Sequence, residues 1–396
     1  MTQRQIFLQN LAQTSDFPLA LEIEKAEGIY LYGNNTKYID LISGIAVSNV
    51  GHRHPKVVEA IKNQVDKYLH LMVYGEYIQS PQVQLANAIV NTLSHFHTSS
   101  GLSLNNVYFT NSGTEAVEGA MKLSKRFTKR SEIISCYNSY HGSTQGALSL
   151  GEEHFRRNYR PLLPATKKIK RNCFEDLSLI NNRTAAVFFE PIGGESGIRP
   201  TDMDYLQALQ LRCLEVGALL VFDEVQSGFG RTGKFWAFEH YDICPDILLC
   251  AKGMGGGMPI GAFIASQEIM SVFKDNPILG HITTFGGHPV SCAASLATLN
   301  AILEEKMLLD IEKKSDLFKS LLVHPKIKEV RGKGLMLAAE FDSFDVLKPI
   351  IDKAIEKGVI TDWFLYCDNS MRIAPPLIIT ENEISWACEV ILSCIE

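Results

Sequence analysis

Short apolar runs alternate with longer amphipathic stretches through the middle of the chain. Helical spacing of apolar positions predicts helices over 113–127 and 202–216. Alternation of buried strands with helices indicates a largely parallel sheet covered on both faces, an α/β fold. The predicted strands are Val107 to Thr110, Ile133 to Cys136, Ala186 to Glu190, Leu219 to Asp223, Ile247 to Cys250 and Ala262 to Ala265.

The two ends of the chain have different patterns. Residues 24–41 alternate apolar and polar positions around Gly33-Asn34-Asn35, which predicts a hairpin, and a helix is predicted from Pro55. A long helical stretch begins near Pro289, residues 334–341 are strand-like, and a final helix is predicted from Glu381. We expect residues 1–54 and 289–396 to form one small α+β domain around a large domain of residues 55–288.

Composition narrows the class of protein. The 396 residues are 46% hydrophobic and 21% charged, with a net charge of −6, which argues against nucleic-acid binding. The basic run over 167–171 is interpreted as a solvated loop-to-strand face. Nine scattered cysteines predict reduced thiols. No apolar stretch approaches the ~20 residues of a membrane span, and residues 1–10 lack a signal pattern. We therefore expect a cytoplasmic protein without a membrane partner.

The most informative segment is Ala251-Lys252-Gly253-Met254-Gly255-Gly256-Gly257, directly after an apolar strand. A lysine between a buried strand and a glycine loop loses solvation, which lowers its pKa and favours a nucleophilic amine. Asp223 ends another apolar strand, 29 residues upstream. A lysine and a carboxylate at the ends of adjacent strands suit a pyridoxal phosphate enzyme, in which the lysine bonds to the cofactor and the aspartate keeps its pyridine nitrogen protonated.

Six motifs carry a family resemblance. They are SGTEA (112–116), YHG (140–142), EPIGGESG (190–197), VFDEVQSGFGRTG (221–233), AKGMGGGMPIG (251–261) and HITTFGGHP (281–289). In order and spacing they resemble class III aminotransferases, the pyridoxal phosphate enzymes that include acetylornithine, ornithine and 4-aminobutyrate aminotransferases. The resemblance covers the chain from about residue 18 to its end and implies fold type I, with a mostly parallel seven-stranded sheet.

The resemblance also implies a set of site residues. Lys252 and Asp223 would be catalytic, and Thr284 would reach the cofactor phosphate of the neighbouring subunit, so that the working unit is a homodimer. Ser112, Gly113 and Thr114 open a helix after a strand, and such a helix start binds anions. The cofactor-binding set implied by the resemblance is Ser112, Gly113, Thr114, Tyr140, His141, Glu190, Asp223, Gln226, Lys252 and Thr284.

Substrate recognition rests on fewer residues. By resemblance, Arg372 binds a substrate α-carboxylate, and Glu195 pairs with this arginine while an ω-amine is bound. Relatives usually read H-G-R-T where this chain has His141-Gly142-Ser143-Thr144. Ser143 cannot bind a second carboxylate, although Arg53, Arg156 or Arg157 could substitute. An ω-amino donor is therefore expected in the broad sense, with 2-oxoglutarate or pyruvate as acceptor. Trp363, Tyr74 and Tyr77 are candidates for shaping the pocket.

Other interpretations of the motifs fit the sequence less well. A G-x-G-x-x-G match over 228–233 fails the context test for a dinucleotide site, since no amphipathic helix follows it. The pairs His52/His54 and His95/His97 lack partners at metal-binding spacing, so no metal is expected. An aminomutase or racemase on the same cofactor would work without an external 2-oxo acid. A non-catalytic cofactor-binding scaffold is disfavoured by the intact motif residues.

Overall fold

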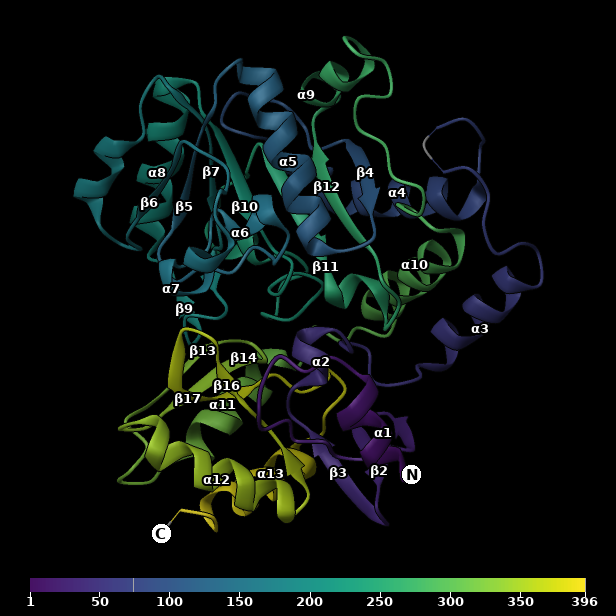
Figure 1. The fold of residues 1–396 in the computed structure, drawn as a ribbon, viewed down its shortest axis with the longest axis vertical. Coiled ribbons are helices and arrows are strands. Elements are labelled where there is room, and N and C mark those ends of the chain that lie inside the picture. Colours follow the sequence, from purple (N-terminus) through teal and green to yellow (C-terminus); the bar gives the residue numbers. More distant parts are fainter. Residues whose placement is uncertain (74, 396) are drawn as a thin grey trace.

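The computed structural model describes residues 1–73 and 75–395 (Figure 1). The α-helices are α1 Gln3–Asn10, α2 Ser43–Ala46, α3 Pro55–Val65, α4 Ser80–Leu93, α5 Gly113–Thr128, α6 Gln145–Leu148, α7 Glu153–Arg156, α8 Met203–Val216, α9 Gln267–Met270, α10 Pro289–Glu304, α11 Ile311–Leu321, α12 Phe344–Glu356 and α13 Glu381–Leu392. The strands are β1 Lys25–Glu27, β2 Tyr30–Gly33, β3 Thr36–Asp40, β4 Asn106–Thr110, β5 Glu132–Cys136, β6 Thr166–Ile169, β7 Thr184–Phe189, β8 Ile192–Gly193, β9 Arg199–Pro200, β10 Leu219–Asp223, β11 Ile247–Ala251, β12 Gly261–Ala265, β13 Glu329–Lys333, β14 Met336–Glu340, β15 Val359–Ile360, β16 Trp363–Phe364 and β17 Cys367–Ile373.

A seven-stranded sheet in the order β4-β12-β11-β10-β7-β5-β6 forms the large domain. The pairs β10–β11, β10–β7, β5–β7 and β5–β6 are parallel, whereas β12 runs antiparallel to both of its neighbours. Successive strand residues point to opposite faces. Thus Val221 packs in the cluster beneath α5, and Phe222 packs in the cluster that includes α4, α8 and α10. The predicted α/β sheet, covered on both faces, is confirmed.

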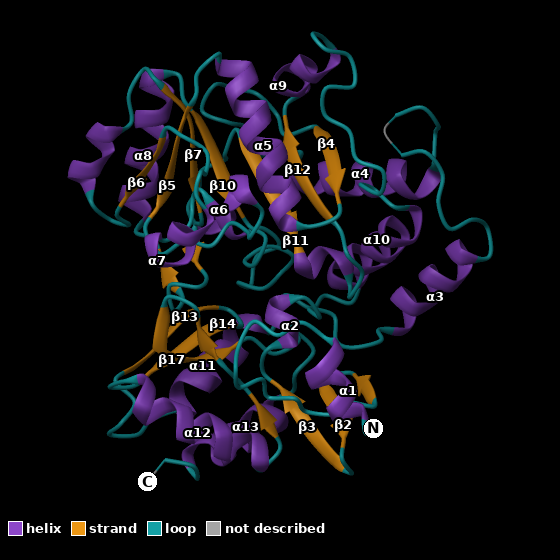
Figure 2. Cartoon of the chain, in the orientation of Figure 1, coloured by secondary structure: helices purple, strands orange, loops and turns teal. Residues whose placement is uncertain are grey.

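The small domain is built from both ends of the chain, below the large one in Figure 2. One of its sheets has the order β1-β2-β3-β15 and the other β13-β14-β17-β16. The predicted hairpin is β2 and β3, and β3 pairs in parallel with β15 through Ile39 and Val359. Apolar residues from these sheets and from α11, α12 and α13 form their own core. Residues of α10 belong instead to the large-domain core, where α10 packs against α3 and α4. The proposed division at residue 289 remains a prediction.

The basic run at 167–171 forms most of the edge strand β6. Lys167 pairs with Glu132 at 2.7 Å and Lys168 with Glu152 at 2.5 Å, so both charges are used within the domain. Charged side chains on an edge strand also discourage pairing with another chain. Among the described residues, no helix is long and apolar enough to cross a membrane.

Candidate active site

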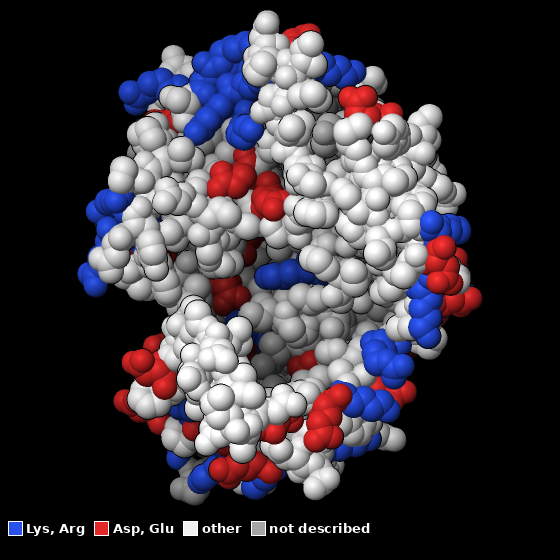
Figure 3. All heavy atoms as spheres, turned by 45° about the vertical axis from the view of Figure 1, so that its right-hand side comes forward, with Lys and Arg blue, Asp and Glu red and all other residues white. Residues whose placement is uncertain are grey.

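A cavity of about 720 Å³ lies where β7, β10 and β11 end. Figure 3 shows a hollow between the two domains, with acidic and basic side chains inside it. In a parallel sheet the carboxyl ends of strands gather at one edge, so residues distant in sequence line one site. The lining residues are Val47, Asn111, Ser112, Gly113, Thr114, Tyr140, His141, Gly142, Ser143, Thr144, Glu190, Glu195, Asp223, Val225, Gln226, Ala251, Lys252, Gly257, Met258, Pro259 and Ile260.

Lys252 follows β11 directly and lines the cavity. Its φ of 47° lies in the left-handed region that non-glycine residues rarely adopt. Such backbone strain concentrates at functional sites. Desolvation lowers the pKa of the Lys252 ammonium below its ordinary value, and the charge of Glu195 partly opposes the shift. The amine is therefore easier to deprotonate than a surface lysine, as a nucleophile or base requires.

Asp223 is a buried carboxylate at the end of β10. Its Oδ2 lies 2.7 Å from His141 Nδ1, and its Oδ1 accepts a hydrogen bond from the Val225 N–H at 3.0 Å. These contacts fix the orientation of the carboxylate within the cavity wall. The buried Nε2 of His141 has no hydrogen-bond partner among the described residues. His141 thus holds Asp223 from the side away from solvent.

The start of α5, from Ser112 to Thr114, and the neighbouring Gly142 line the cavity together, and this part of the wall is called the anion cup below. Ser112 is the N-cap residue, and its hydroxyl accepts a hydrogen bond from the Glu115 N–H at 3.3 Å. The first N–H groups of a helix lack intrahelical partners and point toward a bound anion. The cup is tight: a Cβ on Gly113 would lie 2.9 Å from the Val225 side chain, and one on Gly142 would lie 2.1 Å from Thr114 Oγ1. Neither position has room for a side chain.

Glu195 and Arg372 form a buried bidentate ion pair. Arg372 Nη1 donates to Glu195 Oε1 at 3.0 Å, and Nη2 donates to Oε2 at 3.1 Å. Arg372 Nε donates to Asp362 at 2.7 Å, and Gln226 donates to Glu195 Oε1 at 3.2 Å. Burial raises the pKa of Glu195, but the Arg372 charge and its hydrogen bonds outweigh burial and hold this pKa at about 2. Leu365 N–H donates to Oε2 at 3.1 Å.

Glu190 is a second buried acid in the wall. Its Oε1 accepts a hydrogen bond from the Gly194 N–H at 3.0 Å, whereas Oε2 has no partner among the described residues. Burial raises the pKa of Glu190 to about 7, with a smaller opposing effect from His141 and a reinforcing one from Asp223. Below pH 7 the Glu190 carboxyl is mostly protonated, which limits the charge placed beside Asp223.

The wall around residue 143 is neutral. Tyr140 Oη and Ser143 Oγ lie 2.9 Å apart, and both side chains are exposed toward the cavity. None of the three arginines considered as substitutes is among the lining residues. Arg156 is engaged elsewhere, since it pairs with Glu153 and donates to the Ser149 carbonyl. Arg53 and Arg157 are exposed.

Other candidate residues lie apart from this cavity. Thr284 is exposed and is not among the lining residues of its own chain. Trp363 and Tyr77 are exposed, Trp363 with its ring against Phe344. Tyr74 lies outside the described residues. No cluster of three or more His, Cys, Asp or Glu side chains that could hold a metal occurs over 1–73 and 75–395.

The structure adds residues that motif comparison missed. Asp362 is a second carboxylate partner of Arg372, and the Leu365 N–H contacts Glu195. Val225 lines the cavity between Asp223 and Gln226. For Val225 the adjoining motif was a usable signal. Nothing in the local sequence marks Asp362 or a backbone N–H as part of a site.

Comparison with known proteins identifies the family. Residues 11–395 match the family model described as aminotransferase class-III. The chain is 39% identical over 381 residues to the acetylornithine aminotransferase of Caldanaerobacter subterraneus subsp. tengcongensis, covering 93% of this chain and 92% of the relative. It is 37% identical over 381 residues to that of Aquifex aeolicus, covering 94% and 96%.

Solved structures agree in fold. An ornithine aminotransferase from Toxoplasma gondii superimposes with a TM-score of 0.90 at 28% identity, covering 99% of this chain and 92% of that one. Acetylornithine aminotransferase from Elizabethkingia anophelis gives 0.83 at 30% identity, covering 99% and 97%. The chain belongs to the class III aminotransferases, of fold type I. It is a pyridoxal-phosphate-dependent transaminase.

Proposed function

We propose that this enzyme moves an amino group from an ω-amino donor to a 2-oxo acid in two alternating half-reactions, a ping-pong mechanism. The donor is of the acetylornithine, ornithine, 4-aminobutyrate or diaminobutyrate type, and the acceptor is 2-oxoglutarate or pyruvate. The observation that carries this proposal is the buried bidentate pair between Glu195 and Arg372 beside Lys252. An arginine that can be either paired or released suits a pocket that handles two different substrates.

The residues present fit the cofactor. The anion cup at the start of α5 would hold the phosphate, Asp223 would bind the pyridine nitrogen, and Tyr140 would cover the ring. When bound, pyridoxal phosphate supplies an aldehyde that accepts amino groups and a ring that withdraws electrons. Asp223 suits its role because His141 and the Val225 N–H fix the carboxylate. Gln226 and Glu190 would complete the surroundings of the ring.

Lys252 is assigned two tasks. Its amine would hold the cofactor covalently at rest and, once displaced by a donor, would move a proton between substrate and cofactor. Both tasks require an amine that loses its proton readily, and desolvation lowers the Lys252 pKa in that direction. After Lys252 the chain packs closely: a Cβ on Gly253 would lie 2.4 Å from Asn49 Nδ2 and one on Gly256 would lie 2.1 Å from Thr298 Oγ1.

Arg372 and Glu195 would adapt the pocket to each substrate. With an ω-amine bound, Glu195 neutralises Arg372, so the uncharged part of the donor meets no free guanidinium. With an α-amino or 2-oxo acid bound, Arg372 would bind its carboxylate through two parallel N–H donors. Asp362 keeps the guanidinium in place throughout, because it contacts Nε rather than the two Nη atoms. Exchange of partners then needs movement of Glu195 alone.

A homodimer would complete the site. Thr284 is exposed, next to Ile282 and Phe285, which are half exposed, and near the largely exposed Ile278. Contiguous exposed apolar residues mark interaction surfaces. In the homodimer Thr284 would contact the cofactor phosphate in the neighbouring subunit.

A spectral titration tests the proposal. The cofactor-loaded enzyme is mixed with N-acetylornithine, ornithine, lysine, 4-aminobutyrate, diaminobutyrate, β-alanine or glutamate, and the visible absorbance of the bound cofactor is followed. We expect an ω-amine to bleach this absorbance and a 2-oxo acid to restore it. Turnover of the amine without any added 2-oxo acid would favour an aminomutase or racemase instead. Absorbance that no amine in the panel changes would favour a binding scaffold.

A further inference from the structure

Glu195 lies at the tip of a short hairpin. The strands β8 and β9 pair through Gly193 and Arg199, and residues 194–198 form the turn between them. Within the turn, the N–H groups of Gly197 and Ile198 both donate to the Gly194 carbonyl at 3.2 Å. The position of the Glu195 carboxylate is therefore set by where this turn is held.

The small domain holds the turn through its backbone. The Tyr366 N–H donates to the Glu195 carbonyl at 3.0 Å, and the Leu365 N–H donates to the Glu195 carboxylate. Both donors lie in the turn between β16 and β17. Both contacts reach Glu195 itself. The later residues of the turn, from Gly197 on, are held by a different side chain of the small domain.

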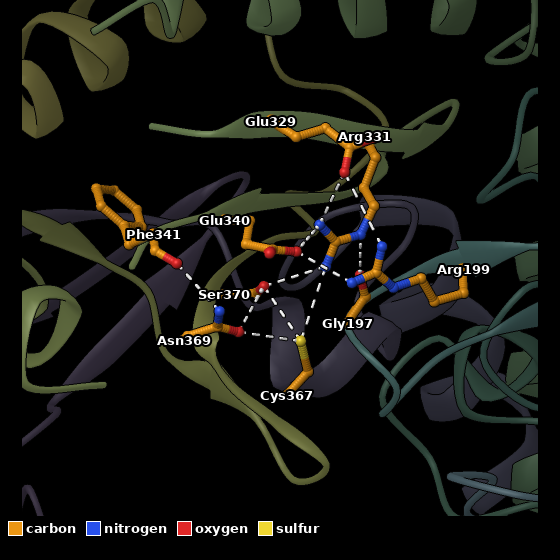
Figure 4. Close-up of polar contacts among 9 residues, drawn as sticks. All are labelled: Gly197, Arg199, Glu329, Arg331, Glu340, Phe341, Cys367, Asn369 and Ser370. Carbon is orange, nitrogen blue, oxygen red and sulfur yellow. Dashed lines mark hydrogen bonds and ion pairs between the residues drawn. The ribbon is translucent and has the colours of Figure 1, made fainter. Parts of the chain in front are cut away.

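Arg331 of β13 is that anchor (Figure 4). It is 7% exposed, and its Nε donates to the Gly197 carbonyl at 2.7 Å. The rest of the guanidinium is held by the small domain: Nη1 donates to Glu340 and Glu329, and Nη2 donates to Ser370 at 3.1 Å. A guanidinium fixed at both ends transmits the position of the β13–β14–β17 sheet to the hairpin.

The fit around Gly197 leaves little room for displacement. A Cβ on this residue would lie 2.5 Å from Cys367 Sγ and 2.9 Å from Arg331 Nη2. The glycine has a φ of 82°, which favours a residue without a side chain. In β9, after the turn, Arg199 donates a hydrogen bond to Glu340 at 3.0 Å. The Glu340 carboxylate therefore binds both Arg199 and Arg331. The turn is therefore held before Gly197 by the contacts to Glu195 and after Gly197 by the Arg199–Glu340 contact.

We propose that Arg331 is a positioning residue that sets the balance between ω-amine and α-amino acid turnover. It holds the 194–198 turn where Glu195 can reach Arg372, although it contacts neither the cavity nor Arg372. When Arg331 is replaced, Glu195 neutralises Arg372 less often, so the half-reaction with an ω-amine becomes slower. The half-reaction with an α-amino acid keeps its rate, because Arg372 is still available to bind the α-carboxylate. The inference rests on the proposed function.

The test compares single-turnover rates of the two half-reactions in the cofactor-loaded enzyme. For Arg331→Gln we expect the ratio of kcat/KM for the best ω-amine to that for glutamate to fall about tenfold. Arg331→Lys keeps the charge but not the fork, so its ratio should lie between those of Arg331→Gln and wild type. Lys328→Met is the matched control. Lys328 is a basic residue directly before β13, but it pairs with Asp342 at the surface and not with the 194–198 turn. Its ratio should be unchanged.

A double-mutant cycle separates positioning from a purely structural role. In a Glu195→Gln background, Arg331→Gln should leave the ratio within about twofold, since the group that it positions is already gone. Equal losses in both half-reactions, or a loss of the same size in that background, would overturn the inference. If Glu195→Gln alone leaves the ratio unchanged, the proposed function of the pair fails. If Glu195→Gln changes the ratio and neither Arg331 variant does, only the inference about Arg331 fails.

Discussion

Lys252 combines three properties that single residues seldom share. It follows a buried strand, it has a left-handed backbone conformation, and its pKa is lowered by desolvation. The sequence predicted the first and the last, because an apolar run before a glycine-rich segment leaves little water around the lysine. The left-handed φ has no local signal in a lysine. It occurs where the chain passes from β11 into the single 3-10 turn Lys252–Gly255.

At the same scale, Glu195→Gln should shift substrate preference. A glutamine keeps the shape of the side chain but carries no charge, so Arg372 keeps only Asp362 as a charged partner. Its two Nη atoms then face the ω-amine without a carboxylate. We expect kcat/KM for the best ω-amine to fall at least tenfold relative to that for glutamate. Stopped-flow measurement of the two half-reactions checks this ratio. Equal preference in variant and wild type would remove the basis for the exchange of partners.

Glu190→Gln should change how stability depends on pH. The pKa of Glu190 is raised from 4.5 to about 7 in the folded chain. Between these values the folded state keeps a proton that the unfolded state releases, so stability falls as pH rises through this window. Glutamine removes this effect, which amounts to about 3 kcal/mol above pH 7.

The measurement compares thermal midpoints of cofactor-free wild type and Glu190→Gln at pH 5 and pH 8. The thermal midpoint of Glu190→Gln should exceed that of wild type at pH 8, and the difference should be much smaller at pH 5. A constant difference between the two proteins at both pH values would show that Glu190 is ionised throughout.

The helix α5 packs closely against β12. A Cβ on Gly119 of α5 would lie 2.3 Å from the Phe263 ring of β12. Because a core this dense cannot absorb an extra carbon, Gly119→Ala should lower the free energy of unfolding by roughly 1 to 3 kcal/mol. Thermal denaturation checks the loss, and Gly119→Ala with Phe263→Leu should recover part of it. An unchanged midpoint in Gly119→Ala would mean that the helix shifts at little cost.

How far the elements could be predicted depended on burial. The central strands are continuous apolar runs, and their predicted bounds differ from the observed ones by at most two residues at either end. Strand β6 was missed as a strand because its lysines are neutralised by Glu132 and Glu152, which lie far from it in sequence. The two-residue strands β15 and β16 carry no periodicity at all, since pairing with β3 and β17 defines them.

Some residues of the active site could likewise be predicted from the sequence and others could not. Lys252, Asp223 and the start of α5 each follow a strand and lie within a motif, so their chemistry could be predicted together with their place in the fold. Asp362 could not be, because it lies in the loop before β16 and meets Arg372 of β17 only when these two strands pair. The anchoring of the 194–198 turn by Arg331 likewise depends on a contact 134 residues away in sequence.

For the whole molecule, the proposed homodimer predicts complementation between two inactive variants. Lys252→Ala and Thr284→Val are coexpressed with different tags, and mixed dimers are isolated. If Thr284 serves the neighbouring site, the Thr284→Val subunit has its own Lys252 and an intact Thr284 from its partner. At limiting cofactor, unfractionated material should reach about a quarter of the wild-type rate, since half of the dimers are mixed and each has one complete site.

Isolated mixed dimers should show half of the wild-type rate per dimer. Activity no greater than the sum of the two parent proteins would place Thr284 in its own subunit's site. A single-subunit mass in solution would contradict the homodimer altogether.

The parallel pairing of β3 with β15 has a consequence for translation. Ile39 leaves the ribosome 320 residues before its partner Val359, a delay of roughly 20 to 60 s at usual elongation rates. During this interval the hairpin β2–β3 has an open edge, while the large sheet, whose strands end at residue 265, can already form. Arg372 emerges after β15 and meets Glu195 only then. The start of α5 and Lys252 can therefore be in place before the Glu195–Arg372 pair forms.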